Sequence, residues 1–425
     1  EWELGVQIFT GGQAEKFTFD ILDATKIIPE ELIPVRKVGR MVLNRNPDNF
    51  FAETEQVAFC TAHVVPGIDF SNDPLLAGRI HSYVDTQISR LGGPNFHEIP
   101  INAPIAPVHN NQRDGMHRQA IHRGRVSYEP NSLGGGCPFQ AGAQQGFVST
   151  ALRIKDREQD KVRAKPEKFA DHYTQATLFY ESQTPVEQSH IAAAFRFELS
   201  KLTVPAIRER MVASLRNVSD ELAKKVAEGL GMETMPAPMP RALPKPPKAE
   251  VAKSPTLSLM ARPGDGSIRG RKVAILVAPG VEGESVASLQ ASLTAQGAVG
   301  RLVGPRIGPV KTASGAMLQA DCSMENEPGF LFDALALPDG KDAVAALARD
   351  AHTMDFIKDQ FRHSKTILVL GASSALVEKA GIPMAASDAG LIVRAAGGAK
   401  PAIDAFITAM AKHRHFERES DPPLV

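Results

Sequence analysis

Residues 78–93 read Gly78-Arg-Ile-His-Ser-Tyr83-Val-Asp-Thr-Gln-Ile-Ser-Arg90-Leu-Gly-Gly93, and the rest of the chain is organised around them. On a helix, Arg79, Tyr83, Gln87 and Arg90 follow one another at spacings of four, four and three residues, which places them on one stripe. The stripe has too many donors for a core face, and its apolar neighbours make it a poor solvent face. The pattern therefore predicts a helix that presents a phenol oxygen to an electron-poor group, with guanidinium groups before and after it.

The chemistry of this stripe suits a metal ligand. A guanidinium one turn away favours the ionised form of a phenol, and such a tyrosinate can ligate ferric iron below a porphyrin ring. An arginine further along the helix can pair with a propionate carboxylate of the same ring. The alternative is an ordinary amphipathic helix with a tyrosine at its boundary, and the spacing alone does not separate the two.

Longer strings carry a specific resemblance. Residues 79–87, Arg79-Ile-His-Ser-Tyr83-Val-Asp-Thr-Gln87, resemble the proximal haem-ligand signature of the haem catalases. The similarity continues through residues 90–102 and 111–116, and residues 46–59 and 65–68 upstream look like the same family. Agreement over strings of this length is not expected by chance.

The resemblance implies a role for each residue of the stripe. Tyr83 is expected to be the axial ligand of a haem, of type b or d, with Arg79 as its charge partner. Arg90 is expected to bind a propionate, and a surface ion pair is its alternative. Gln87 takes a haem-facing position at which small catalases tend to carry histidine. The chain is therefore suspected to be a large-subunit monofunctional haem catalase.

Cys60 stands where, in large-subunit catalases, a residue lies beside the ligand tyrosine and can be joined covalently to its β-carbon. We hypothesise a thioether link between Cys60 and Tyr83, for which a free buried thiol is the alternative. The nearby histidines have no mutual metal-ligand spacing and are interpreted as structural: His63, His81, His97 and His117.

Composition narrows the class of protein. The 48 basic and 48 acidic residues balance, so no global field favours nucleic acid or an acidic membrane as partner. No apolar run approaches the length of a membrane span. The three cysteines show no disulfide or metal spacing, which fits a reducing compartment, and a cytoplasmic location is predicted. The chain starts without Met or a leader pattern, so the missing targeting signal says little.

The first part of the chain predicts part of an antiparallel β-barrel. Residues 17–22 alternate like a strand, and residues 35–43 do so with a break at Gly39 that is typical of a bend or bulge. Residues 50–56 predict a short helix. From residue 92 to about 155 the chain is rich in Pro, Gly, Asn and His, which indicates an irregular arm. The resemblance implies that this arm is the family's wrapping loop and that the protein assembles as a homotetramer.

Helical patterning follows from residue 166 to residue 230, with Thr184 as a cap before Pro185 and Gly231 as a C-terminal stop. The proline-rich stretch from residue 235 predicts an extended linker. We expect a catalase-type core with the haem helix and arm at 1–155, a helical segment at 156–234, a linker at 235–268 and a last domain at 269–425.

That last domain reads as α/β. Apolar strands at 272–278, 298–303, 334–338 and 366–370 alternate with helical stretches, which predicts a doubly wound sheet of parallel strands. The resemblance implies a flavodoxin-like domain, similar to the amidotransferase and DJ-1 group. In related hydrolase-like proteins a nucleophilic cysteine follows the last of these strands, but the sequence there is Leu370-Gly-Ala-Ser-Ser374. A structural or assembly domain is favoured, with Ser373 or Ser374 as a weak nucleophile candidate.

The family resemblance implies that two hydrogen peroxide molecules are converted to water and dioxygen. The family's distal histidine, in a Val-His-Ala-Arg-Gly-like string, and its distal asparagine are expected upstream of the ligand tyrosine, and no such string occurs in this sequence. A fragment that lacks the distal half is therefore expected, with no certain catalytic residue. The alternative is an inactive fragment that acts as a structural, assembly or chaperone-like module.

Overall fold

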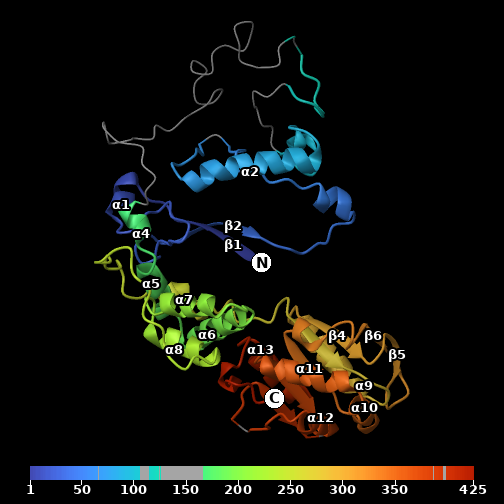
Figure 1. The fold of residues 1–425 in the computed structure, drawn as a ribbon. Coiled ribbons are helices and arrows are strands. Elements are labelled where there is room, and N and C mark those ends of the chain that lie inside the picture. The colour runs from blue at the N-terminus through green and yellow to red at the C-terminus, as the bar shows by residue number, and fades with distance from the viewer. Residues whose placement is uncertain (66, 106–113, 124, 126–165, 386, 396–398) are drawn as a thin grey trace, which may run out of the picture. The chain divides into compact units, whose positions relative to one another are not determined.

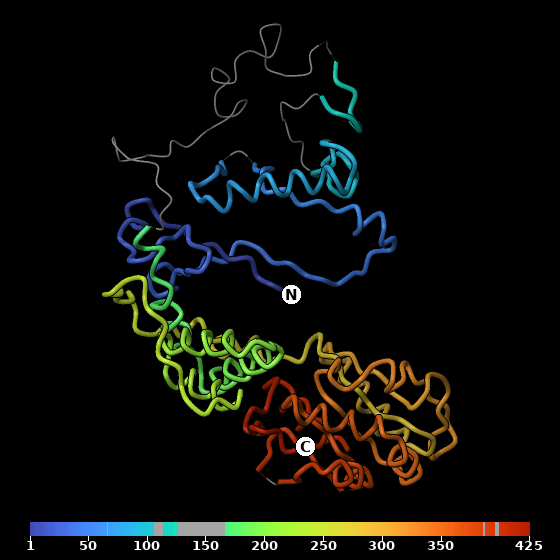
Figure 2. The backbone as a smooth tube through the Cα atoms, viewed as in Figure 1, coloured from blue at the N-terminus to red at the C-terminus, as the bar shows by residue number. Residues whose placement is uncertain are grey.

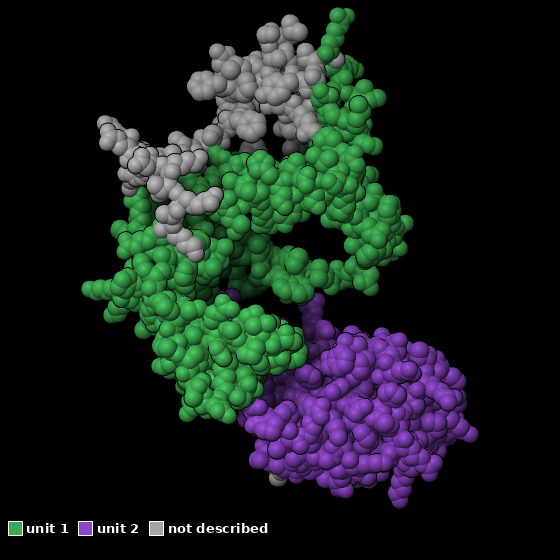
Figure 3. Space-filling model, in the orientation of Figure 1, with its two compact units in different colours: residues 1–257 green, residues 258–425 purple. Residues whose placement is uncertain are grey.

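The computed structural model describes residues 1–65, 67–105, 114–123, 125, 166–385, 387–395 and 399–425 (Figure 1). The chain divides into two compact units, unit 1 at Glu1–Leu257 and unit 2 at Ser258–Val425 (Figure 3). The predicted linker at 235–268 spans this division. Much of the predicted arm, 92–155, lies outside the described residues.

Unit 1 opens with a two-stranded antiparallel sheet. Strand β1, Trp2–Val6, pairs with β2, Arg36–Met41. Leu4 lies opposite Gly39 while Gly5 lies opposite Lys37, so one residue of β2 is extra at this point. The predicted break in this strand is thus confirmed as a bulge, whereas the closed barrel stays a prediction.

The strand predicted at residues 17–22 is wrong. The segment follows helix α1, Gly11–Lys16, and runs through bends. Phe17 and Phe19 are buried, and their rings stack at 5.0 Å in a small cluster with Ile33. Their spacing of two residues reflects this local aromatic packing rather than a pleated strand, because burial rather than pairing selects the apolar positions here.

The helical part of unit 1 agrees with the predicted signals. Thr184 caps its helix with a reciprocal bond to Glu187, and Pro185 occupies the first turn. Gly231 follows the last helix in the left-handed conformation, with φ +68°. The short helices that precede and form this part are η1 Phe51–Glu55, η2 Phe96–Glu98, α4 Glu167–Ala170, α5 Thr174–Ser182, α6 Pro185–Ser200, α7 Pro205–Leu215 and α8 Asp220–Gly229.

Residues 235–257 are fastened to unit 1 rather than free (Figure 2). Asn217 donates its side-chain amide to the Met239 carbonyl at 2.8 Å. The Glu250 carboxylate accepts the backbone and side-chain bonds of Thr18, at 2.6 and 2.7 Å. This part of the proline-rich stretch therefore acts as a strap along unit 1.

Unit 2 is built on a six-stranded parallel sheet of order β10-β9-β8-β3-β4-β7 (Figure 1). The four apolar runs predicted as strands are confirmed as its centre. A separate hairpin of β5 and β6 was not predicted. The bounds are β3 Lys272–Leu276, β4 Val299–Gly304, β5 Gly308–Lys311, β6 Met317–Ala320, β7 Cys322–Ser323, β8 Ala334–Leu337, β9 Thr366–Leu370 and β10 Leu391–Arg394.

Helices cover both faces of this sheet. The step from β3 to β4 runs in the opposite direction along the sheet from the step from β8 to β9, so right-handed crossovers place their helices on opposite faces. Helices α9 and α13 contact each other, whereas α10 and α11 both contact α12. The flavodoxin-like class stays a prediction. The bounds are α9 Gly283–Ala295, α10 Lys341–Leu347, α11 Ala351–Arg362, α12 Ser374–Lys379 and α13 Ala399–Met410.

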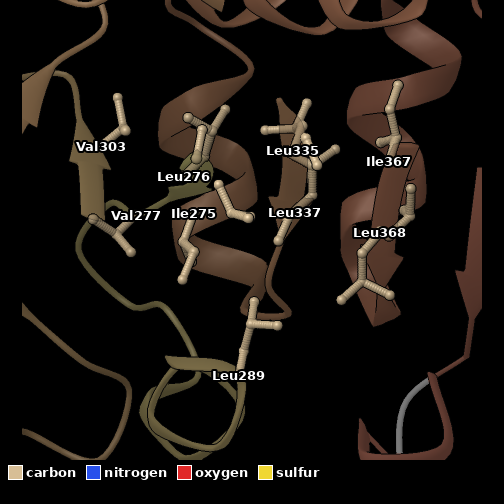
Figure 4. Packing of buried hydrophobic residues seen from close by; sticks show 14 of the residues in the cluster. Ile275, Leu276, Val277, Leu289, Val303, Leu335, Leu337, Ile367 and Leu368 are labelled. Atoms are coloured by element: carbon tan, nitrogen blue, oxygen red, sulfur yellow. The ribbon is translucent and has the colours of Figure 1, made fainter. Parts of the chain in front are cut away.

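The core of unit 2 explains why its strands are so apolar. Figure 4 shows Ile275, Leu335 and Ile367 on three neighbouring strands, and all three side chains are fully buried. A parallel sheet that is covered on both faces offers no solvent side, so both sides of each strand carry aliphatic residues.

Lys365, directly before β9, is a buried cation with a consequence for stability. Its ammonium donates to the Phe330 carbonyl at 2.9 Å and to the Phe332 carbonyl. Burial, with Arg414 nearby, lowers the pKa of Lys365 from 10.5 to about 8. The unfolded chain therefore binds more protons between these two pH values, so stability rises with pH through that window. Below the window the contribution of this group does not change with pH.

We expect the wild-type chain to gain stability relative to Lys365→Met between about pH 8 and pH 10.5, by on the order of 1 to 3 kcal/mol. Denaturant unfolding of both proteins across this range measures their free energies of unfolding. Taking the difference between the two proteins cancels the titration of all other groups. Lys400→Met removes an exposed lysine of α13 and is the matched control. A difference that stays flat with pH would contradict the assignment.

Candidate functional site

Helix α2, Pro74–Leu91, carries the predicted stripe and has clear ends. The Asp73 side chain accepts the backbone N–H of Leu75 at 2.9 Å, and Pro74 stands at the first helical position. Gly92 closes the helix in the left-handed conformation, with φ +86°. The predicted helix is thus confirmed and extends one turn further toward the N-terminus.

Arg79 and Tyr83 meet as their spacing predicts. The Arg79 guanidinium donates to the Tyr83 hydroxyl at 3.2 Å, and its carbon lies 5.0 Å from the centre of the tyrosine ring. A guanidinium that donates to a phenol oxygen fixes the direction of that oxygen. These two residues therefore form an oriented oxygen donor on the surface of α2.

Gln87 and Arg90 continue the stripe but contact the preceding segment. The buried Gln87 amide donates to the Phe59 carbonyl at 3.0 Å. The Arg90 guanidinium donates to the carbonyls of Glu55, at 2.5 Å, and Val57, and to the Gln87 side chain at 3.0 Å. The surface ion pair weighed for Arg90 is not what the structure shows. Gln87 and Arg90 instead hold residues 55–59, the end of η1 and the segment after it, against α2.

Phe59 is a site residue that the sequence reasoning missed. Its ring meets the Tyr83 ring edge to face, with 5.4 Å between centres, and the Arg79 guanidinium lies 6.0 Å from it. The available signal was its position next to Cys60 at the end of a resembling string. Cys60 itself is buried and carries no disulfide. The thioether link to Tyr83 stays a hypothesis.

Several residues that precede Tyr83 in the sequence expose large apolar side chains. Phe59 is 59% exposed although it packs on Tyr83. The segment leading into α2 exposes further large apolar residues: Phe50, Phe51, Val57, Ile68 and Leu75. Exposed apolar surface next to an oriented oxygen and two guanidinium groups fits a flat apolar cofactor that carries carboxylates. The residues present therefore fit a haem.

His63 and His97 pack against neighbouring rings, and the described residues contain no group of three or more side chains that could hold a metal ion. The His63 ring stacks on Phe96, with 5.5 Å between centres, and stands perpendicular to His97 at 5.4 Å. Burial lowers the pKa of both histidines, because it disfavours their charged forms. This packing agrees with the structural interpretation of His63 and His97.

The serine candidates of unit 2 do not form a nucleophile. Ser373 is 1% exposed, and its hydroxyl donates to the Pro338 carbonyl. Ser374 donates to the Gly371 carbonyl at 3.3 Å. A nucleophilic serine requires a base that accepts its proton and access to a substrate. Neither hydroxyl meets that requirement, so this weak candidate is set aside.

Three family models match the chain one after another. They are described as catalase, over residues 1–135, catalase-related immune-responsive, over residues 166–230, and the C-terminal domain found in long catalases, over residues 269–420. The first covers α2 and its stripe, and the last covers the parallel sheet. The chain is thus similar to catalase family models over three successive segments.

Comparison with individual proteins gives the degree of similarity. The chain is 48% identical to Catalase HPII of Pseudomonas putida over 99% of its own length and 57% of that protein. It is 45% identical to Catalase C of Rhizobium meliloti, over 100% of the chain and 58% of the relative, and 39% identical to Catalase-1 of Neurospora crassa, over 99% and 59%. The chain thus spans less than two thirds of the length of these relatives. Together the matches show that the chain is similar to catalases along almost its whole length.

Within the part of the chain that the structure describes, none of the helices combines the length and apolar character that a membrane crossing needs.

Proposed function

We propose that this chain takes part in the haem-dependent decomposition of hydrogen peroxide to water and dioxygen, with Tyr83 as the axial ligand of the haem iron. The observation that carries the proposal is the bond of 3.2 Å from the Arg79 guanidinium to the Tyr83 hydroxyl on a helix face next to an exposed aromatic ring. The similarity to catalases along the whole chain supports the same function.

Each residue of the stripe has a distinct task in this proposal. Haem, when bound, supplies the redox chemistry. Arg79 donates to the Tyr83 oxygen and holds it in one direction, which orients that oxygen as a ligand. Phe59 packs edge to face against the phenol ring and helps to fix its orientation. Gln87 and Arg90 keep the loop that carries Phe59 against α2.

Arg90 retains donors for a propionate. A guanidinium has five N–H groups, and the contacts to Glu55, Val57 and Gln87 use three of them. The side chain is exposed at its outer end. We propose that the remaining donors bind a haem carboxylate while the others hold the loop, so that one residue links cofactor binding to loop position.

A separate test concerns the proposed thioether link between Cys60 and Tyr83. Formation of this link removes two hydrogen atoms, so the joined peptide is lighter than the sum of the two separate peptides by that mass. We expect this joined peptide in a digest of haem-loaded protein after exposure to peroxide. Cys322, which is also buried but lies in unit 2, is the matched control and is expected as an unmodified thiol. Two separate, unmodified peptides would instead support the free-thiol alternative.

Self-association is part of the proposal, as a homotetramer. The β1–β2 pair exposes apolar residues along its length, namely Trp2, Leu4, Val38 and Met41. Apolar strands of this kind are normally covered by further protein. Sedimentation of the haem-loaded chain measures the assembly directly.

The decisive experiment separates cofactor binding from turnover. The purified chain is mixed with haem, its Soret band is recorded, and oxygen release is followed after addition of peroxide. A Soret band with oxygen release supports the full proposal, whereas a band without oxygen limits it to haem binding. A colourless protein would favour the alternative of a structural, assembly or chaperone-like module.

A further inference from the structure

The strap of unit 1 is bonded to both ends of helix α5. At the amino end of the helix, the Thr174 hydroxyl donates to the Pro247 carbonyl at 3.4 Å. At the carboxyl end, the Ser182 hydroxyl accepts the backbone N–H of Ser254 at 2.9 Å. The strap therefore runs along α5 in the same direction as the helix and is fixed at two points.

The strap has more chain between these two points than the helix requires. Residues 174–182 of the helix rise by about 12 Å, whereas residues 247–254 can span roughly 23 Å when extended. The excess bows away from α5, and the Glu250 carboxylate holds it there by accepting the backbone N–H and the hydroxyl of Thr18. The space left under the bow is a cleft with a volume of about 610 Å³, which lies within the range of small-ligand sites.

Three parts of unit 1 line this cleft. The first is one face of α5, because the lining residues of that helix follow one another at helical spacing. The second is the turn between α7 and α8, and the third is the bowed part of the strap. Arg241, earlier in the strap, completes the lining. The residues are 173, 174, 177, 178 and 181 of the first part, 216–220 of the second and 248–252 of the third.

The charged side chains of the lining are only partly matched. Arg216 donates to the Asp220 carboxylate at 2.8 Å, and the Glu250 carboxylate is engaged by Thr18. Within the described ranges of the chain, the other charged side chains of the lining form no salt bridge: Glu181, Arg241 and Lys248.

These three groups lie at opposite ends of α5. The Arg241 guanidinium carbon lies 5.7 Å from the centre of the Tyr173 ring, at the amino end, and Lys248 follows Pro247, which is bonded to the same end. Glu181 is in the last turn. The helix rises by about 12 Å between residues 173 and 181, so the cleft carries positive charge at one end and negative charge at the other.

Arg241 presents a free fork of donors. Its Nε and Nη2 donate to the side-chain oxygen and the carbonyl of Asn217, at 3.0 and 3.3 Å. The remaining N–H groups on Nη1 and Nη2 form the outer fork of the guanidinium, which fits the two oxygens of a carboxylate.

The bowed part of the strap also offers backbone groups. Residues 248–252 are extended or bent, and their backbone groups form no hydrogen bond to another part of the chain that the structure describes. Unpaired backbone groups along an extended segment can pair with an added peptide strand.

We propose that this cleft binds a short peptide of three or four residues with free ends. Its carboxylate binds Arg241 and Lys248, its ammonium group binds Glu181, and its backbone pairs with residues 248–252. The length follows from the geometry, because an extended peptide advances by about 3.4 Å per residue, so that three residues span about 10 Å and four about 14 Å.

The test is calorimetric titration of the full chain with trialanine. Amidation of the peptide's carboxylate is expected to weaken binding by about tenfold or more, because the guanidinium fork loses its charged acceptor. Acetylation of the amino group is expected to weaken it by roughly two- to fivefold, because Glu181 is an exposed partner. Equal binding of trialanine and its amide by the wild type, or binding of neither, would overturn the proposal.

Variants separate ligand binding from a structural role. Arg241→Gln is expected to reduce the preference for the free carboxylate over the amide to about threefold or less, whereas a structural effect weakens both peptides and keeps the preference. Lys248→Gln alters an exposed side chain without a salt bridge and is the second variant if Arg241→Gln fails to fold. It is expected to reduce the preference by roughly two- to fivefold.

Arg210→Gln is the matched control. Arg210 is an exposed residue of α7 that donates to the Ala206 carbonyl at 3.1 Å and does not line the cleft. The control is expected to keep the preference of the wild type. A preference that is unchanged in both Arg241→Gln and Lys248→Gln, or that falls as much in the control, would contradict the assignment.

Discussion

We expect Tyr83→Phe to abolish the Soret band of bound haem and to reduce haem affinity by more than about a hundredfold, because Tyr83 is the proposed iron ligand. The substitution removes the only oxygen of the side chain and leaves its ring against Phe59, so the fold of α2 is retained. Loss of a partner that merely orients a ligand costs roughly 10- to 100-fold in metal affinity, so loss of the ligand itself costs more. Haem titration followed at the Soret maximum measures the effect.

Tyr173→Phe is the matched control for this experiment. Its hydroxyl contacts Ser214 at 3.4 Å, beside the helices of unit 1 and away from the stripe, so haem binding is expected to be unchanged. Arg79→Leu is the graded variant, and we expect roughly a 10- to 100-fold weaker affinity because the phenol loses its charge partner. An unaltered Soret band in Tyr83→Phe would remove Tyr83 as the ligand.

Phe332→Ala lowers the free energy of unfolding of unit 2 by about 3 to 5 kcal/mol. The ring is 1% exposed, packs 5.6 Å from the centre of Phe356, and has the Lys272 ammonium 4.5 Å from its own centre. Truncation leaves a cavity and removes both contacts. Urea unfolding of the full chain, followed through hydrogen exchange of peptides from β8 and β9, reports on unit 2 specifically.

Phe330→Ala is the control for Phe332→Ala, two residues earlier in the same turn. Phe330 is 55% exposed, and its carbonyl, which the substitution keeps, accepts the Lys365 bond. We expect a change below about 1 kcal/mol. Equal losses in the two variants would mean that backbone strain in this turn, rather than burial of the Phe332 ring, sets the stability.

Local signals explain what could be predicted in advance. Helix α2 was predicted because Arg79, Tyr83, Gln87 and Arg90 follow one another at spacings of four, four and three residues within one stretch of chain. The strands of unit 2 were predicted because both faces of their sheet are buried. Each strand therefore consists of consecutive apolar residues, which can be recognised in the sequence. The strand at residues 17–22 was wrong because the same alternation there comes from two stacked phenylalanines.

The sequence by itself determined the stripe of Arg79, Tyr83, Gln87 and Arg90 on α2, the alternation of strands and helices in unit 2, and the resemblance to the catalases. Only the tertiary structure decided that Phe59 lies on Tyr83, that Arg90 holds the end of η1 against α2, and that the strap is bonded to α5 through Thr174 and Pro247. The physical reason is the range of the interactions. Helix spacing and strand patterning act between near neighbours, whereas these contacts join residues separated by 24 to 73 positions, and chain packing alone brings such residues together.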